Sequence, residues 1–383
     1  MKWKTARIGD VCQIISGTTP STKIQTYWDG DLNWVTPGEI EENSKYIFST
    51  QKKITEQAVK ETNLRLLPIG TVLLSSRAPI GKVAIAATEM YCNQGFKNLI
   101  CSKEVHNEFL FWFLRGKKDF LNFLGRGATF KEISKDIVAA IELPLPPLAE
   151  QRRIADILDK ADAIRRKRQQ SLKLTDDLVK SQFVEMFGDP VTNPKGWPIA
   201  KVGDLADVFT GGTPSRNKLD YYIGNIPWVK TGEIEQGLIF NAEERISEKA
   251  LKETNCKLLP VNTILVAMYG QGKTRGQAGI LKIKAATNQA CAAILPNDSY
   301  NTDYLHQYLR IQYEALRGLG RGAQQANLNL SMVRDFPVLN TPLTLQTQFA
   351  AFVGQADKSK FTMQRQLSEI EILSSALKQK FFA

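Results

Sequence analysis

The sequence predicts a protein of mixed α and β structure (α/β in the broad sense, α+β within each domain), made of two globular domains and two long helices. Three observations predict it. The chain repeats itself with a period of about half its length, each copy begins with short apolar runs between turn residues, and each copy ends in a long helical stretch. A chain of 383 residues is too long for one ordinary core but suits two domains.

The repeat is visible by eye over most of the chain. The segments that match are GDVCQIISGTTPS with GDLADVFTGGTPS, NWVTPGEI with PWVKTGEI, VKETNLRLLPIGTVLL with LKETNCKLLPVNTILV, Asn93-Gln94 with Asn288-Gln289, and GRGA at Gly125 with GRGA at Gly320. The chain is therefore two copies of one module, which predicts an internal pseudo-two-fold relation.

The globular domains are predicted at 1–149 and 196–342. Runs such as TVLLSSRAPIGKVAIAA and TILVAMYGQGKTRGQAGILKIKAA are typical of strands bounded by turns. Segments such as NEFLFWFLRGKKDFLNFL and DYLHQYLRIQYEALRGL have the period of amphipathic helices. Each domain is therefore expected to mix both kinds of element.

The long helices are predicted at 150–188 and 343–383. From Glu150 to Phe187 there is no Gly or Pro, Pro-Leu-Pro-Pro precedes the segment, and Gly188-Asp189-Pro190 follows it. Such a helix is about 55 Å long. The two helices are expected to form an antiparallel coiled-coil pair. The middle of the seam is polar at 165–170 and at 358–360, so either the pair splays there or another surface covers it.

The charge favours a polyanionic partner. The net charge is +11, and since each long helix carries only +2, the remaining +7 lies almost entirely on the globular parts. Basic proteins bind nucleic acid by displacing counterions from phosphates, so the globular parts are expected to contact nucleic acid. A merely basic soluble protein would have the same composition.

Several function classes find no support in the sequence. The five cysteines are widely spread and His106 and His306 are the only histidines, which argues against disulfide, metal and nucleophilic triad sites. YGQGKTRGQ lacks the first glycine of a Walker loop, and no dinucleotide fingerprint or methyltransferase tetrapeptide is present. The start of the chain lacks a signal peptide and no segment is apolar enough to span a membrane, so a cytoplasmic protein is expected. A duplicated module without a duplicated catalytic set predicts a binding protein that carries no cofactor.

Three kinds of segment offer side chains for DNA. The loops between two predicted strands carry groups able to grip base edges, the G-T/G-T-P-S turns carry hydroxyl and basic groups for phosphates, and the GRGA segments carry both. The predicted contacts are Arg77 and Lys82; Tyr269, Gln271, Lys273, Thr274 and Arg275; Thr19, Ser21 and Lys23; Thr213, Ser215, Arg216 and Lys218; Arg126 and Lys131; and Arg321, Gln324, Gln325 and Asn327. A plain surface hairpin and self-capping turns are the alternatives. Trp34, Trp228, Tyr27 and Tyr221 recur in register and are interpreted as core residues.

The long helices offer side chains for a protein partner. The predicted contacts are Gln151, Ile154, Leu158, Ala161, Leu172, Val179, Phe183, Phe349, Phe352, Leu367 and Leu373.

These features together resemble the specificity subunit of type I restriction-modification systems. The resemblance rests on the doubled layout, the G-T/G-T-P-S and W-V-x-x-G-E-I segments, the SRAPIG and YGQGKTRG loops, PLPPLAEQRRIADILDKAD and SQFVEMFGDP, and it covers essentially the whole chain. It implies two target-recognition domains that each read half of a split, asymmetric site in double-stranded DNA. It also implies spacer helices that dock two methyltransferase subunits, which bring S-adenosylmethionine, and a motor-nuclease subunit that joins them.

One departure and two alternatives remain. PLPPLAEQ is well formed in the first copy, whereas the second has FPVLNTPLTLQTQ, which predicts weaker symmetry of partner docking. A tandem-module adaptor that binds protein, or an unrecognised DNA methyltransferase or nuclease, are the competing functions.

Overall fold

The computed structural model describes residues 3–77, 79–125, 131–320 and 327–382. The chain forms two compact units, Met1–Gln170 with Gln364–Ala383, and Ser171–Met363. Each unit combines one globular part, which we call the first or the second domain, with one half of each long helix. The two units are described separately below.

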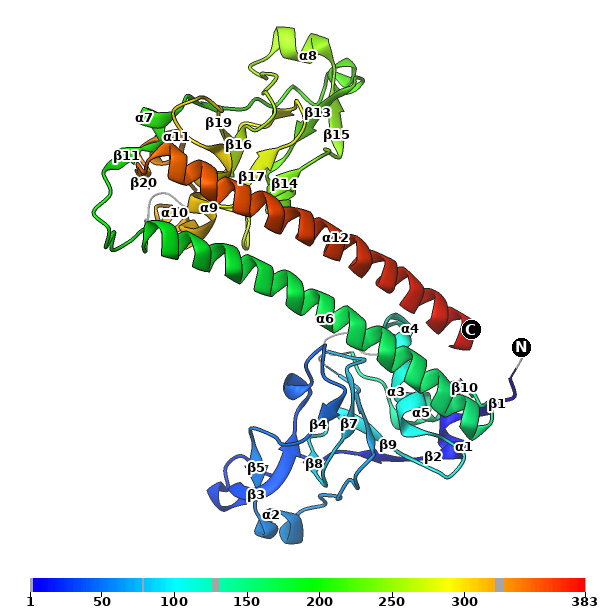
Figure 1. Cartoon of the computed structure of the whole chain (residues 1–383). Helices are drawn as coiled ribbons and strands as arrows, with labels where there is room; N and C mark the ends of the chain where they lie inside the picture. The colour runs from blue at the N-terminus through cyan, green and yellow to red at the C-terminus, as the bar shows by residue number, and fades with distance from the viewer. Residues whose placement is uncertain (1–2, 78, 126–130, 321–326, 383) are drawn as a thin grey trace. The chain divides into compact units, whose positions relative to one another are not determined.

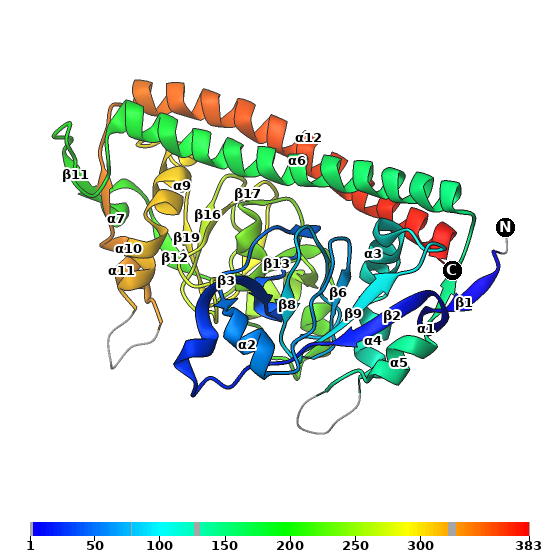
Figure 2. The same cartoon turned by 90° about the horizontal axis from the view of Figure 1, so that it is seen from below.

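The first domain is built on two small sheets. The five-stranded sheet has the order β2 (Cys12–Ser16), β9 (Phe96–Cys101), β6 (Val72–Ser75), β7 (Val83–Ala86) and β4 (Tyr46–Ile47), antiparallel except for the β4–β7 pair. The three-stranded sheet has the order β5 (Lys53–Ile54), β3 (Trp28–Val35) and β8 (Tyr91–Cys92), and β1 (Thr5–Arg7) pairs with β10 (Glu142–Pro144). Figure 2 shows β2, β9 and β6 lying side by side.

Short helices complete the first domain. They are α1 (Ile8–Val11), η1 (Gln25–Tyr27), η2 (Pro37–Glu39), α2 (Glu56–Glu61), α3 (Asn107–Gly116), α4 (Lys118–Leu124) and α5 (Lys135–Ala140). Six consecutive residues of α3, Phe109–Leu114, are buried. Helix α3 is therefore the central helix of this core, packed against β6 and β7 on one side and facing α6 on the other (Figure 1).

The second domain repeats this plan strand for strand. Its five-stranded sheet has the order β12 (Val208–Thr210), β19 (Cys291–Ile294), β16 (Ile264–Ala267), β17 (Ala278–Leu281) and β14 (Leu238–Ile239). The small sheets are β15 (Glu244–Ile246), β13 (Ile226–Val229) and β18 (Ala286–Thr287), and β11 (Ile199–Lys201) with β20 (Pro337–Leu339). The helices are α7 (Val202–Leu205), η3 (Leu219–Tyr222), η4 (Thr231–Gln236), α8 (Glu248–Glu253), α9 (Thr302–Ile311), α10 (Tyr313–Gly318) and α11 (Leu330–Arg334).

Matching side chains produce matching local structure. Helix α2 begins where the Thr55 hydroxyl accepts from the Ala58 N–H at 3.2 Å, and α8 begins where Ser247 accepts from Ala250 at 3.3 Å. These N-caps satisfy backbone donors that the first helical turn leaves free. The two copies of the sequence therefore fold by the same local rules.

The two long helices are α6 (Leu148–Phe187) and α12 (Leu343–Phe382). The structure starts α6 two residues before the predicted start and confirms α12 at its predicted start. In the second unit the end of α6 meets the start of α12, since the Phe183 and Phe349 rings lie 5.4 Å apart and Lys360 pairs with Asp176 at 2.8 Å. The helices are therefore antiparallel there, as predicted.

The polar side chains in the middle of the two long helices find their partners in two ways. In the first unit Arg165 donates to Asp162 on its own helix at 2.8 Å and to Asn43 of the first domain at 3.0 Å. In the second unit Lys360 reaches across to Asp176. A domain surface thus covers one polar segment, and an ion pair between the helices satisfies the other.

The apolar stripe of each helix packs on the chain's own domains, which corrects most of the predicted partner contacts. Helix α6 and helix α12 each bury one stripe against α3 or α9, so these side chains lie inside the cores and are not presented to another protein. The corrected residues are Ile154, Leu158, Ala161, Val179, Phe183 and Phe349. Leu172, Phe352 and Leu367 are half-buried, and Leu373 is 55% exposed.

Gln151 is also corrected from a partner contact to a structural residue. Its side chain is fully buried, accepts from the His106 N–H at 2.8 Å, and donates to the carbonyls of Glu104 at 2.9 Å and Pro146 at 2.8 Å. Gln346 makes the equivalent bonds in the second unit, from the Asn301 N–H and to the Thr341 carbonyl, both at 2.8 Å. The start of α12 therefore keeps these hydrogen bonds, although its sequence differs from that at the start of α6.

Candidate nucleic-acid interface

The loop that follows β6 joins the predicted DNA-binding segments of the first domain. The Ser76 N–H donates to the Gly95 carbonyl at 2.7 Å, which ties the β6–β7 hairpin to the Asn93-Gln94 turn. The Ile133 N–H donates to the Ser76 carbonyl at 2.9 Å, which brings in the segment after GRGA. Three segments that are distant in the sequence therefore meet at the base of one hairpin.

The same bonds recur in the second domain. The Met268 N–H donates to the Ala290 carbonyl at 2.8 Å, and the Leu328 N–H donates to the Met268 carbonyl at 3.0 Å. Both bonds connect backbone atoms, so the frame does not depend on the side chains at these positions. The β16–β17 hairpin is therefore the counterpart of the β6–β7 hairpin.

The G-T/G-T-P-S turn joins the same cluster in each domain. The hydroxyls of Thr19 and Thr213 donate to the side-chain oxygens of Gln94 and Gln289. A Cβ on Gly17 would lie 1.9 Å from the Asn93 carbonyl oxygen, so only glycine fits there. The repeated Gly, Thr and Asn-Gln residues thus hold two loops together, which is a structural reason for their recurrence.

Trp34 and Trp228 hold these turns by hydrogen bonds from the core. The indole N–H of Trp34 donates to the Thr18 carbonyl, and that of Trp228 donates to the Gly212 carbonyl, both at 3.1 Å. Their exposed fractions are 3% and 2%, which confirms the interpretation of these side chains as core residues. Tyr27 and Tyr221 are also buried.

Charged side chains surround the hairpin of the first domain. Arg77 is half-exposed and lies 3.9 Å from Glu132, whose other carboxylate oxygen pairs with the buried Lys97 at 3.0 Å. The Lys82 ammonium donates to the Pro37 carbonyl at 3.0 Å, so it is engaged inside the domain. Arg77 is therefore the better placed of the two predicted loop contacts.

The β16–β17 hairpin of the second domain presents different side chains. Tyr269 is 44% exposed, and Gln271 and Lys273 are exposed. Thr274 donates to the Glu235 carboxylate at 2.8 Å, and Arg275 is half-buried with its Nε enclosed. Gln271 and Lys273 carry the groups that can donate to base edges in the major groove.

The basic residues beside the turns are already paired in the second domain. Arg216 lies 2.6 Å from Glu244 and over the Tyr222 ring, and the hydrogen bond to Glu244 raises the pKa of Arg216. Lys218 donates to the Tyr221 hydroxyl at 2.8 Å. Both are more than half exposed, so phosphates can still exchange for these partners.

The remaining predicted contacts divide by position. Ser21, Lys23 and Ser215 are exposed on the turns, and Lys131 and Asn327 are exposed just before the residues that join the hairpins. Arg126, Arg321, Gln324 and Gln325 lie outside the described residues. The predicted segments thus gather at two equivalent loop clusters, one in each domain.

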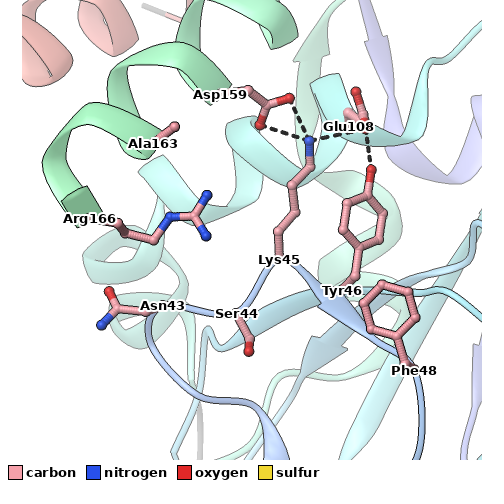
Figure 3. A pocket seen from close by; sticks show the side chains of 9 residues that line it. All are labelled: Asn43, Ser44, Lys45, Tyr46, Phe48, Glu108, Asp159, Ala163 and Arg166. Atoms are coloured by element: carbon pink, nitrogen blue, oxygen red, sulfur yellow. Dashed lines mark hydrogen bonds and ion pairs between the residues drawn. The ribbon is translucent and has the colours of Figure 1, made fainter. Parts of the chain in front are cut away.

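A pocket of about 480 Å³ lies between the first domain and α6 (Figure 3). Lys45 pairs there with Asp159 at 2.6 Å and with Glu108 at 3.1 Å, and the Tyr46 hydroxyl donates to Glu108. Burial opposes ionisation of Glu108, but the hydrogen bonds from Tyr46 and Lys45 outweigh it and lower the pKa of that carboxyl. The network fastens the start of α6 to the domain.

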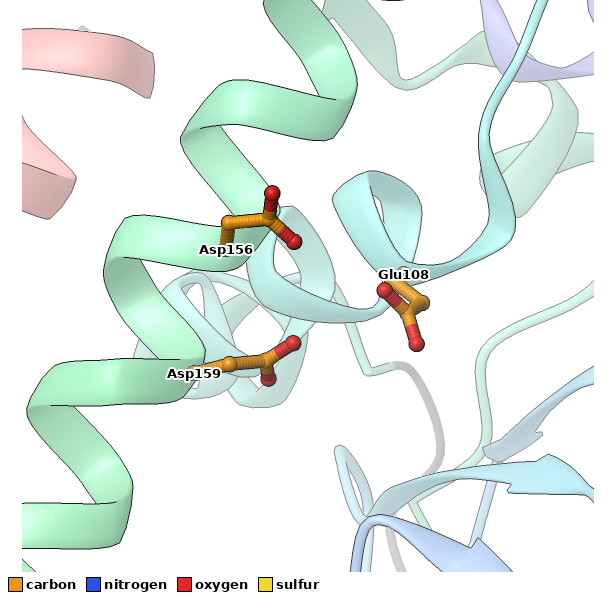
Figure 4. Close-up of side chains that lie close together, drawn as sticks. All are labelled: Glu108, Asp156 and Asp159. Atoms are coloured by element: carbon orange, nitrogen blue, oxygen red, sulfur yellow. The ribbon is translucent and has the colours of Figure 1, made fainter.

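Three carboxylates of this region, those of Glu108, Asp156 and Asp159, have oxygens within 4.8 Å of one another (Figure 4). Such a group has the ligand chemistry of a hard cation. The Lys45 ammonium pairs with two of the three, Glu108 and Asp159, and so occupies the space between them. We assign the group a structural role.

Residues 1–174 and 194–371 match the sequence profile described as the Type I restriction modification DNA specificity domain. The chain belongs to this family. The match confirms the resemblance drawn from the sequence, and its two parts coincide with the two copies of the module. The loop clusters are therefore features of two specificity domains in tandem.

Individual relatives agree with the family. The chain is 29% identical to the type I restriction enzyme MjaIX specificity subunit of Methanocaldococcus jannaschii, over 99% of this chain and 92% of that protein. It is 26% identical to the EcoR124I/EcoR124II specificity subunit of Escherichia coli, over 43% of this chain and 41% of that one. Both names describe specificity subunits.

Solved structures share the fold. The S subunit of a type I restriction-modification system from M. genitalium superposes with a TM-score of 0.65 at 14% identity, covering 100% of this chain and 96% of that one. A chain from a type I restriction-modification system structure on complex assembly and conformational transition gives a TM-score of 0.57 at 19% identity, covering 99% and 97%. These likenesses show the architecture of a specificity subunit.

Two features of this specificity subunit were missed from the sequence. Lys97 and Glu132 brace the first hairpin from a strand and from the segment before α5, and α10 contacts the second hairpin through Tyr313 and Arg317. Neither feature has a sequence signal, because each joins residues more than 30 positions apart.

Proposed function

We propose that each domain of this specificity subunit reads one half of a split, asymmetric sequence in double-stranded DNA. The observation that carries the proposal is the pair of equivalent loop clusters with different side chains at their hairpins. Arg77 beside Glu132 stands in one cluster, and Tyr269, Gln271 and Lys273 stand in the other. Two domains that share a backbone frame but differ in their hairpin side chains suit a DNA site whose two halves differ in sequence.

Charge supports DNA as the ligand. The net charge is +11, and most of it lies outside the long helices. Half or more of the hydrogen bonds in protein–DNA complexes go to phosphates and sugars, and exposed Lys and Arg groups supply them. Lys23, Lys131, Arg216 and Lys218 stand at the loop clusters for this purpose. The binding is therefore expected to weaken steeply with salt.

The helices serve as spacer and as docking surface in this proposal. Helix α6 runs from one unit into the other, so its length sets the distance between half-sites. Apolar side chains stay exposed on it and on α12: Leu174 at 57%, Leu178 at 54%, Ile372 at 69% and Leu373 at 55%. Two methyltransferase subunits dock on such surfaces, with a motor-nuclease subunit joining them.

The chemistry belongs to the partners. In the proposed assembly the methyltransferase brings S-adenosylmethionine and methylates adenine, while this chain binds no cofactor and works in the cytoplasm. Among the described residues, no helix combines the length and apolar character needed to cross a membrane.

The test is co-expression of the chain with the methyltransferase encoded beside it, followed by methylome sequencing of the host DNA. We expect adenine methylation in both halves of one split motif, and none from the methyltransferase expressed alone. A soluble complex that leaves the DNA unmethylated would support the protein-binding adaptor instead. DNA modification by the purified chain alone would support an enzyme.

A further inference from the structure

The hairpin of the second domain is held from behind by α10. The Arg317 guanidinium donates through Nη1 to the Arg275 carbonyl at 3.1 Å and through Nη2 to the Gly272 carbonyl. The Tyr313 hydroxyl donates to the Lys273 carbonyl at 2.7 Å and accepts from Arg317 Nη1 at 2.8 Å. Two side chains one helical turn apart thus bind three carbonyls of the loop.

The hairpin needs such support because of its glycines. Gly270, Gly272 and Gly276 have φ of 150°, 59° and 89°, values that glycine adopts at little cost and that it also leaves easily. A loop with three such residues does not hold one conformation by its own torsional preferences. The bonds from α10 therefore supply the order that the loop sequence lacks.

The bonds that Arg317 and Tyr313 make to the loop go to its backbone oxygens. The side chains of Tyr269, Gln271 and Lys273 are left exposed. Arg317 itself is half-buried, and its two terminal nitrogens are occupied by the loop and by Tyr313. Its placement is that of a support beneath the loop.

The first domain has the same device at the same place. Asn122 of α4 donates to the Ile80 carbonyl at 3.2 Å, just before Gly81, whose φ is 87°. In the register that aligns Gly125 with Gly320, Asn122 corresponds to Arg317 and Ile80 to Arg275. The support has therefore been kept in both domains while the side chain that provides it has changed.

We propose that Arg317 is a positioning residue: it fixes the conformation of the Tyr269–Gly276 hairpin and so sets the base preference of the second domain without touching a base. This inference rests on the proposed function. Binding with specificity requires the reading side chains to be held in place before the DNA arrives, because ordering a loop on binding costs affinity. Loss of the support should therefore reduce discrimination between sequences more than it reduces binding to DNA in general.

The experiment uses the full chain purified with its methyltransferase. The probe is the duplex that the wild-type complex selects from random-sequence DNA, together with duplexes altered in one half-site at a time. Arg317→Met removes the two guanidinium bonds to the loop and leaves no donor in their place, and Tyr313→Phe removes the third bond, from the Tyr313 hydroxyl to the Lys273 carbonyl. Arg310→Gln is the control, because it removes the same charge from the neighbouring helix, where Arg310 pairs with Asp176 at 3.5 Å.

We expect Arg317→Met to lower discrimination at the second half-site at least tenfold and Tyr313→Phe to lower it several-fold. Discrimination at the first half-site should stay unchanged in both, and Arg310→Gln should change discrimination at neither. Arg317→Lys should restore part of the loss, because one ammonium can still reach a loop carbonyl.

Three outcomes would overturn the proposal. Unchanged discrimination in Tyr313→Phe and Arg317→Met would show that the hairpin orders itself. An equal loss on all sequences would make Arg317 a phosphate contact. If Arg317→Met unfolds the domain, full discrimination in Tyr313→Phe would still refute the idea. A wild-type complex that selects no sequence at all would instead refute the proposed function, and the two failures are distinguishable.

Discussion

Gln151 provides a prediction that separates a structural role from a partner-binding role. Its fully buried amide makes three hydrogen bonds, with the His106 N–H and with the carbonyls of Glu104 and Pro146, at 2.8, 2.9 and 2.8 Å. Gln151→Ala removes all three. At about 1 kcal/mol net for each bond, the free energy of unfolding of the first unit should fall by about 3 kcal/mol.

The assay is hydrogen exchange of the full chain followed by mass spectrometry. A loss of about 3 kcal/mol raises the open population by roughly 100-fold, so amides at the start of α3 should exchange that much faster in Gln151→Ala. Peptides from α9 are the internal control, and Gln346→Ala should reverse the pattern, with a smaller loss from its two bonds. Unchanged exchange together with lost methyltransferase binding would refute the reasoning and restore Gln151 as a partner contact.

Four further predictions concern stability and specificity. Burial lowers the pKa of His306 to about 3, whereas the imidazole of the unfolded chain takes up its proton below about pH 6.5. The second unit should therefore lose about 1.4 kcal/mol of stability per pH unit as the pH falls from about 6.5 towards the folded-state pKa, and nothing more from this group below it. Urea titrations in which His306→Gln loses stability equally steeply would contradict this. Phe382→Ala should lower the free energy of unfolding of the first unit by about 3–5 kcal/mol, and Phe187→Ala that of the second unit, since both rings are buried. Thermal unfolding experiments in which either variant destabilises the other unit instead would contradict this. Inserting residues near Arg168 should change the number of unread base pairs in the methylated motif, and an altered half-site would exclude a spacer role. Gln271→Ala should relax one position of the second half-site by about 1–3 kcal/mol, whereas a uniform loss of affinity would mark a phosphate contact.

The sequence predicted the fold well because the strongest signals were local or repeated. The absence of Gly and Pro from Glu150 to Phe187, with Pro before and Gly after, predicted α6 to within two residues at its start. The apolar stripe on that helix was visible too. What covers the stripe was not, since periodicity shows that a face is buried but carries no information about the surface that buries it. The structure places α3 and α9 there.

The candidate site could be predicted by segment but not by side chain. Recurrence of the G-T/G-T-P-S turn, the hairpin and the Asn-Gln pair predicted a common role, and the structure brings these segments together. Whether a given cation is available depends on a partner far away in the chain. Lys82 is engaged by the Pro37 carbonyl and Arg216 by Glu244, pairings of 45 and 28 positions that composition cannot reveal.

The two loop clusters show how one frame can carry two specificities. The bonds that join the segments at the hairpin base connect backbone atoms in both domains, so they survive substitution of the side chains. The side chains around that frame have changed: Lys97 and Glu132, paired at 3.0 Å in the first domain, correspond in register to Ala292 and Asn327 in the second. Replacing both members of this partly buried ion pair removes both charges, so neither is left without the other. Divergence could therefore proceed at the hairpin without refolding the domain, provided that α4 or α10 continued to hold the loop.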